Sequence, residues 1–313
     1  MKKLYYLDSA KGIGMLLIIL GHILMVKDSF LLNFIYTFHV PLFFIISGIL
    51  IEYTKEYKKP FFPLLLKKIK RLIIPYFVYD TLYNIIYSCI NGFENFRWCQ
   101  IDTLILYGRT ATWFLPVLFL GELFIILLHK VLKKTSIITL ISLFIFIFSM
   151  FITPPNGIIY VLLRITTAIG FLTIGMFTLQ IINRLDTCKL ALPLLFLLML
   201  LITVINGKVS CHTLKYNNIL LFIAGALIGS LFCLLLCKKT KLMNIFEYFG
   251  RNSVIIMCTH QSILLLLNYF VPFSYRIPSI LLYFLVVVLL EIIIIPFVNK
   301  YLPFTIGNFV FKN

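Results

Sequence analysis

Two side chains near the N-terminus have the types and the spacing for proton transfer inside a membrane. Lys11 and His22 lie in a nearly unbroken apolar stretch, residues 7–50. A helix turns about 100° and rises about 1.5 Å per residue, so this spacing brings both onto one face, about 16 Å apart along the axis. An imidazole can take a proton from a hydroxyl near neutral pH. The alternative for His22 is a packing histidine that hydrogen-bonds across a helix interface.

Two further histidines lie in apolar segments, where a polar side chain is expensive unless something uses it. His39 comes two residues before Pro41 in the run FHVPLFFIISG. It is a candidate for substrate binding, or it satisfies backbone that Pro41 loosens. His260 ends the run GRNSVIIMCTH and is a second candidate for substrate binding. A satisfied interior histidine is the alternative.

Acidic residues in the same segments are candidates to assist catalysis by orienting the donor or polarising a histidine. Asp8, Asp80 and Glu122 are the alternatives for this role, and we assign it to Asp8 and Glu122. Asp8 is about 21 Å from His22 by helix rise, so it cannot contact that imidazole directly. Both acids alternatively serve as partners in ion pairs inside the bundle.

The cationic run KKIKR and a tryptophan suggest where a nucleotide-bearing cofactor could bind. Lys68 and Arg71 belong to this run, residues 67–71, which borders an apolar segment. Ammonium and guanidinium groups suit phosphate oxygens, whereas attraction to anionic lipid is the simpler explanation of the charge. Trp113 opens another apolar segment, either beside the cofactor or as an interfacial anchor.

The composition requires a membrane to hold these residues. The 313-residue chain is 61% hydrophobic and only 12% charged, far from the quarter or so of charged residues in soluble chains. We therefore expect an all-α bundle in one domain, residues 1–313, without a separate soluble part. Ten apolar segments are each long enough to cross a bilayer: residues 10–26, 31–51, 72–91, 113–132, 136–153, 158–182, 190–206, 218–237, 253–270 and 279–298.

The charges favour one orientation and argue against two other classes of protein. With ten spans and the N-terminus in the cytosol, twenty Lys and Arg residues fall inside and six outside, as the positive-inside rule requires. The net charge of +17 is spread in small groups between spans, which does not suit a nucleic-acid-binding face. The seven cysteines contain no C-x-x-C spacing, so no metal site is expected.

The motifs and their order resemble those of the family 3 integral-membrane acyltransferases, in particular the fucose 4-O-acetylase-like branch that acylates surface polysaccharides. The motifs are DSAKGIGMLLIILGH, FHVPLFFIISG, KKIKRLIIPY, WFLPVLFLGE and GRNSVIIMCTH. A basic residue, ten residues and a histidine form the most specific one, which Lys11 and His22 satisfy. The paired basic motif of the family, Arg-x-x-Arg, is here Lys68-x-x-Arg71, which keeps the charge but loses one bidentate fork.

The resemblance implies an acyl donor, usually acetyl-CoA, and a sugar or glycan acceptor, which can be polyprenyl-linked, at the outer face of a bacterial plasma membrane. On this hypothesis Lys68 and Arg71 hold the CoA phosphates and Lys11 lines the path of the donor. His22 deprotonates the sugar hydroxyl, although a covalent acyl-histidine would also fit. Membrane lipid is the other expected partner.

Two other functions suit part of the same pattern. A transporter or flippase for a polyprenyl-linked glycan would also have many spans, interior charges and a positive cytosolic rim. A non-catalytic membrane scaffold is the second alternative. Release of CoA from acetyl-CoA in the presence of an acceptor glycan would distinguish an acyltransferase from both.

Overall fold

The computed structural model describes residues 3–25, 27–95, 110–153, 157–240 and 244–308. Within these ranges the regular elements are helices, with an isolated β-bridge between Ser210 and Lys215. The longer helices are α1 (Tyr5–Leu24), α2 (Phe30–Tyr53), α4 (Ile74–Asn91), α6 (Phe114–Leu132), α7 (Thr135–Ser149), α8 (Ile158–Asp186), α9 (Ala191–Asn206), α10 (Ile219–Thr240), α12 (Ser253–Phe270) and α13 (Ile277–Tyr301). The shorter ones are η1 (Glu56–Lys58), α3 (Phe61–Lys68), η2 (Ile69–Ile73), η3 (Phe93–Asn95), η4 (Ala111–Trp113), α11 (Asn244–Arg251) and η5 (Pro303–Ile306).

The all-helical class is confirmed, and a helix lies in each of the ten predicted ranges. Seven helices of the described chain are long and apolar enough to cross a bilayer by length and composition: α1, α2, η4 with α6, α8, α10, α12 and α13. The helices α7 and α9 are apolar but shorter, with 15 and 16 residues. The count of ten spans and the cytosolic position of both termini therefore stay predictions. Most of the predicted outer loop 92–112, namely residues 96–109, lies outside the described residues.

Large apolar side chains cover the outer faces of several helices. On α13 the exposed residues recur about once per turn, at Leu281, Leu285, Leu289 and Ile293. The helices α7 and α9 expose similar rows. Contiguous apolar surface of this extent is unfavourable in water but suits contact with lipid. This surface agrees with an integral membrane protein.

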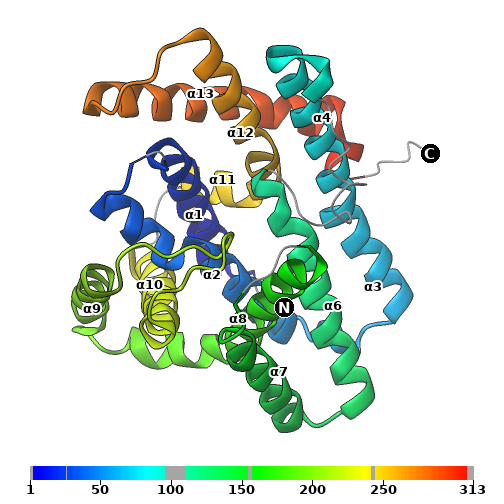
Figure 1. Cartoon of the computed structure of the whole chain (residues 1–313). Coiled ribbons are helices and arrows are strands. Elements are labelled where there is room, and N and C mark those ends of the chain that lie inside the picture. Colours follow the sequence, from blue (N-terminus) through cyan, green and yellow to red (C-terminus); the bar gives the residue numbers. More distant parts are fainter. Residues whose placement is uncertain (1–2, 26, 96–109, 154–156, 241–243, 309–313) are drawn as a thin grey trace.

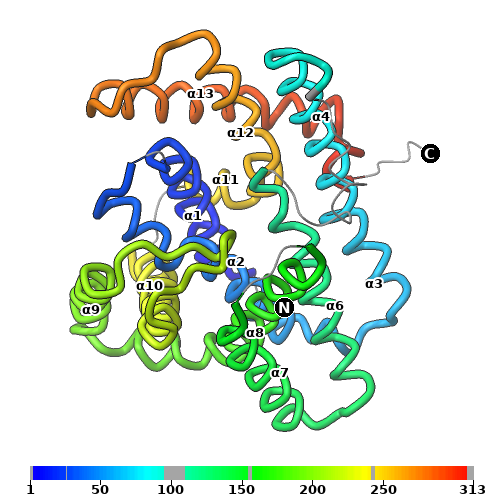
Figure 2. The backbone as a smooth tube through the Cα atoms, viewed as in Figure 1, coloured from blue at the N-terminus to red at the C-terminus, as the bar shows by residue number. Residues whose placement is uncertain are grey.

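The first helix lies at the centre of the arrangement that positions the candidate site. It contacts α2 and α10 as well as α11, α12 and α13 (Figure 1). Following the chain in Figure 2 from its blue start to its orange part shows that α1 and α12 lie side by side. The first and ninth of the predicted spans are thus remote in sequence but packed against each other.

Two glycines allow α1 to approach α11 closely. A Cβ atom on Gly12 would lie 1.9 Å from the carbonyl oxygen of Phe246, and one on Gly250 would lie 1.7 Å from the carbonyl oxygen of Asp8. Any larger residue would force the two backbones apart, as at other small-residue helix crossings. The close packing brings the end of α11, with Arg251, beside the first turn of α1.

Candidate functional site

A cavity of about 720 Å³ lies where α1, α2, η4 and α12 meet the segment 207–218, which joins α9 to α10. His22, His39 and Trp113, three of the predicted site residues, line it. The aromatic and apolar part of its wall includes Phe43, Phe114 and Met257, whereas Asp28, Lys208, Lys215 and Asn217 supply polar groups. The cavity thus offers both an apolar surface for an acyl chain and polar groups for a hydroxylated molecule.

His22 lies on the wall of this cavity and is held through Gln261. The amide nitrogen Nε2 of Gln261 lies 3.2 Å from Nδ1 of His22. The amide oxygen of Gln261 accepts a hydrogen bond of 2.5 Å from the backbone N–H of Ala111. Because a backbone N–H only donates, this bond fixes which end of the Gln261 amide faces His22. The sequence reasoning missed Gln261, although it directly follows His260 in the motif that drew our attention.

The segment that binds Gln261 is itself anchored by a buried carboxylate. Asp80 of α4 accepts hydrogen bonds from the hydroxyls of Thr110 and Thr112 at 3.3 and 3.2 Å. These two threonines flank Ala111 at the start of η4. A carboxylate that accepts two hydroxyl bonds away from water fixes the local backbone. Asp80 therefore sets the position of the N–H that orients Gln261.

His260 lies against His22, with ring centroids 5.2 Å apart. It is completely buried, and its Nδ1 lies 2.6 Å from the carbonyl oxygen of Ile256, one helical turn earlier. His39 makes the same kind of bond to the carbonyl of Ile35 at 2.9 Å, while its ring lines the cavity. A carbonyl only accepts, so Nδ1 carries the proton in both rings. In the described part of the chain, no three His, Cys, Asp or Glu side chains converge to suit a metal ion.

The far wall of the cavity is built around a buried arginine. Arg164 of α8 donates to the backbone carbonyl of His212 from Nε at 2.9 Å and from Nη2 at 2.7 Å. The hydroxyl of Tyr160 donates to the same carbonyl at 2.5 Å. The guanidinium also lies 4.8 Å from the ring centroid of Trp113, in cation–π geometry. These contacts fasten the segment 207–218 and Trp113 to one helix.

Cys211 is a thiol on the cavity wall. Burial raises its pKa from 9.0 to about 12. The thiolate, not the thiol, is the nucleophile of cysteine chemistry. A covalent role is therefore disfavoured for Cys211.

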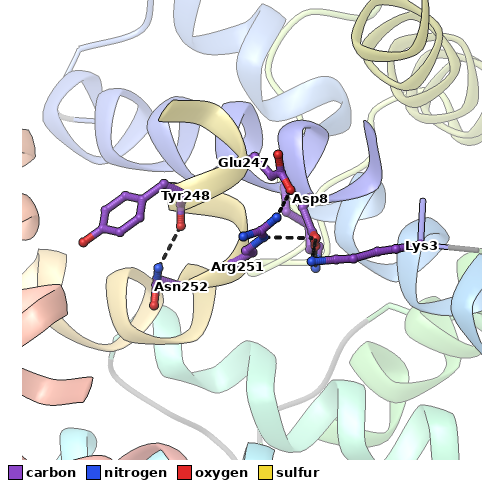
Figure 3. Close-up of polar contacts among 7 residues, drawn as sticks. Lys3, Asp8, Glu247, Tyr248, Arg251 and Asn252 are labelled. Carbon is purple, nitrogen blue, oxygen red and sulfur yellow. Dashed lines mark hydrogen bonds and ion pairs between the residues drawn. The ribbon is translucent and has the colours of Figure 1, made fainter. Parts of the chain in front are cut away.

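Asp8 and Lys11 lie at the opposite end of α1, away from the cavity lining. Asp8 forms ion pairs with Lys11 at 2.7 Å, Lys3 at 3.5 Å and Nε of Arg251 at 3.9 Å. Figure 3 shows Arg251 between Asp8 and Glu247, with which it also pairs. The predicted catalytic role of Asp8 and the donor-path role of Lys11 stay predictions. The geometry brings these residues together with other charges and not with His22.

Lys68 and Glu122 come together at a third place, also away from the cavity lining. The ammonium of Lys68 lies 2.8 Å from Glu122 and 2.6 Å from Glu56. Burial lowers the pKa of Lys68, but the two carboxylates outweigh this effect and raise it above the usual value. The two carboxylates neutralise the charge of this lysine locally, so Lys68 is poorly suited to bind a phosphate. Arg71 is exposed on η2, so it is the better placed of the two predicted phosphate ligands.

Besides Gln261, the sequence reasoning missed the segment 207–218 as a wall of the cavity. From the sequence, Lys208 and Lys215 counted only among the six basic residues of the outer segments, and His212 had no assigned role. A signal was present, since a polar segment with a histidine between two apolar runs is a place where a membrane protein can recognise a polar ligand.

A family model described as an acyltransferase domain matches residues 4–297 of the chain, which is nearly its whole length. No curated protein matches the sequence, and no solved structure does.

Proposed function

Since the chain belongs to the family 3 acyltransferases, we propose that it moves an acetyl group from acetyl-CoA to a hydroxyl of a cell-surface or lipid-linked sugar. The fucose 4-O-acetylase-like branch and a bacterial plasma membrane are part of this proposal. The observation that carries it is the position of His22 on the wall of a mixed polar and apolar cavity, held by Gln261.

The reaction needs a general base and a cavity that holds both the acyl donor and the acceptor hydroxyl. The hydroxyl oxygen attacks the thioester carbonyl, a C–O bond forms, the C–S bond breaks, and the hydroxyl proton passes through a histidine to the departing thiolate. Proton transfer by a placed imidazole contributes about 10²–10⁴ to such a rate. His39, Asn217 and the rim groups Asp28, Lys208 and Lys215 support recognition of a hydroxylated acceptor, because they line the same cavity as His22.

The proposed donor path runs along α1 from its Lys11 end. The phosphates would stay near Arg71 and the other cations of the N-terminal side, while the pantetheine arm, comparable in length to the Lys11–His22 offset, reaches the imidazole. Phe43 lies on this path, because it lines the cavity and its ring also packs on Gly14, three residues beyond Lys11. Movement of Phe43 would connect the cavity to the donor side.

The test is transfer of label by the purified protein in proteoliposomes. Acetyl-CoA carrying ¹⁴C in its acetyl group is supplied with a panel of octyl glycosides of common sugars, fucose included, and with lipid extract of the source cells. We expect alkali-labile label on at least one acceptor, and CoA release that depends on that acceptor.

The control is His22→Ala, which should insert with the same yield and Tm and transfer at least a hundredfold more slowly. If His22→Ala transferred as fast as the wild-type protein, the assignment of the base would be wrong. If the wild-type protein consumed no acetyl-CoA with any acceptor but moved a lipid-linked glycan between leaflets, the transporter alternative would replace the proposal.

A further inference from the structure

Three of the other four histidines bond the backbone in a way that His22 does not. His39, His129 and His260 each place Nδ1 within 3.0 Å of the carbonyl four residues earlier, at Ile35, Ile125 and Ile256. Those carbonyls require a proton on Nδ1. Nδ1 of His22 instead lies against the Gln261 amide.

The bond to Gln261 sets the tautomer of His22. Ala111 occupies the Gln261 oxygen, so the amide presents its N–H to the imidazole. Nδ1 of His22 must then accept, and the proton of the neutral ring sits on Nε2. The resting His22 is a donor on its Nε2 side and has its lone pair covered by Gln261.

His260 has the complementary arrangement. Its proton is on Nδ1, bonded to Ile256, so its Nε2 carries a lone pair. In the part of the chain that the structure describes, this Nε2 is buried without a hydrogen-bond partner. A buried acceptor without a partner loses the hydrogen bonds that it would make in water, so its presence needs an explanation. The neighbouring ring is that of His22, at 5.2 Å between centroids, and among the described residues it makes no hydrogen bond to Nε2 of His260 in the resting structure.

We propose that His22 and His260 form a proton relay, in which His22 takes the acceptor's proton on Nδ1 while its Nε2 proton passes to Nε2 of His260. The inference rests on the proposed function and identifies the partner of the histidine as a second imidazole instead of a carboxylate. His260 acts through His22 and is a positioning and relay residue.

The step balances in protons and charge. The acceptor hydroxyl displaces the Gln261 amide, whose 3.2 Å bond is at the long end of the usual range. One proton leaves the hydroxyl for Nδ1 and a second leaves Nε2 for His260, which becomes imidazolium while His22 stays neutral. The alkoxide attacks the thioester, and the protons return by the same route to the thiolate. No imidazolium forms beside the reacting carbonyl.

Other titratable groups near the pair are few and come from several elements. His39, His212, Cys211, Asp28, Lys208 and Lys215 line the cavity with His22, and α13 contributes Glu291, which accepts from Thr259 at 2.7 Å. Glu291 bonds the neighbour of His260, and its second oxygen, Oε2, is buried without a hydrogen-bond partner among the described residues. Because these groups would also affect a pH optimum, the relay is tested by the tautomers of the two rings and by the number of protons transferred.

The first measurement is the tautomer of each ring, which needs no acceptor. The chain has five histidines, so ¹⁵N-histidine protein in lipid nanodiscs gives a spectrum that single substitutions assign. We expect His22 to be protonated on Nε2 and His260 on Nδ1. A proton on Nδ1 of resting His22 would overturn the relay whatever the enzyme transfers.

The second measurement is the transfer rate in mixtures of H₂O and D₂O, which shows how many protons move in the rate-limiting step. The wild-type rate should depend on the deuterium fraction along a curve, which indicates two protons in one step. His260→Asn keeps a donor for the Ile256 carbonyl but lacks the Nε2 lone pair. Its kcat should fall roughly a hundredfold, with a linear dependence and an unchanged KM for acetyl-CoA.

The matched control is His129→Asn. His129 makes the same Nδ1 bond, to Ile125, and its buried Nε2 also lacks a partner in the described part of the chain, but its ring stacks on Tyr57 and is not part of the cavity lining. This variant should keep the wild-type kcat and the curved dependence. A His260→Asn enzyme with a curved dependence or a kcat within threefold of wild type would overturn the relay. A wild-type protein without any transfer would overturn the proposed function instead, and the relay with it.

Discussion

Lys68 and Glu122 form a buried ion pair of 2.8 Å between α3 and α6, although 54 residues separate them. Removing one member of such a pair leaves an uncompensated charge in the interior, at a cost of about 3–5 kcal/mol. We expect Lys68→Met to lower the Tm strongly, and Lys68→Met with Glu122→Met to recover part of the loss, because Glu56 still lacks its cation. Thermal unfolding in detergent measures both.

The double variant also separates structure from cofactor binding. If it is folded and keeps its KM for acetyl-CoA, Lys68 supports the fold. A folded double variant with a KM raised more than tenfold would show instead that Lys68 holds phosphate.

Arg71→Ala is expected to raise the KM for acetyl-CoA roughly tenfold, because a hydrogen bond to a charged phosphate contributes about 1.5 kcal/mol. The guanidinium is exposed on η2, so the Tm should not change. The control is a donor without the nucleotide, the acetyl thioester of N-acetylcysteamine, whose KM should be the same in both proteins. An equal effect on both donors would exclude phosphate binding by Arg71.

The helices could be predicted from the sequence because apolar runs of sufficient length leave little choice of conformation in a membrane. His22, His39 and Trp113 could each be singled out from the sequence as a polar or aromatic residue of an apolar segment, but their convergence at one cavity was not predicted. The number of spans did not follow. Length and hydropathy single out seven helices of the described chain, and the apolar helices α7 and α9, with 15 and 16 residues, are shorter than a usual span.

The partners of the polar residues could not be predicted, because they come from remote parts of the chain. In the run KKIKR, nothing indicated that Lys68 has partners, yet Glu56 and Glu122 both form ion pairs with it. Gln261 was overlooked because an amide neither titrates nor forms ion pairs, and its role depends on contacts with His22 and Ala111. Such contacts are a property of packing and not of local pattern.

Alkylation should distinguish Cys211 sharply from an exposed thiol. Its pKa of about 12 lies three above the ordinary 9.0, so below pH 9 its thiolate fraction is about a thousandfold smaller. In variants that keep one cysteine, we expect Cys188, which is exposed, to react with N-ethylmaleimide at pH 8 much faster than Cys211. The Cys211 rate should still be rising at pH 11. Rapid reaction of Cys211 at pH 7 would contradict its burial.

Arg164→Gln should loosen the wall of the cavity formed by the segment 207–218. The change removes charge-assisted bonds to the carbonyl of His212 and the contact with Trp113, with an expected cost of about 2–3 kcal/mol. Trypsin cleavage at the exposed Lys208 and Lys215 measures the loosening. Tyr160→Phe removes one bond to the same carbonyl and should accelerate cleavage less. Equal cleavage of Arg164→Gln and wild type would refute the fastening role.

Phe43→Ala should widen the range of acyl donors, because Phe43 lines the cavity and its ring fills the space beside Gly14 toward the Lys11 end of α1. Removal of the ring leaves room for several methylene groups, each with a burial gain of about 0.8 kcal/mol. We expect the ratio of kcat/KM for butyryl-CoA to that for acetyl-CoA to rise about tenfold. Phe44→Ala is the matched control, since Phe44 stacks on Phe114 at 4.7 Å but is not part of the cavity lining. Both variants should lose stability, yet only Phe43→Ala should change the donor preference; an equal change in both would mean that loosened packing, and not the shape of the cavity, selects the acyl chain.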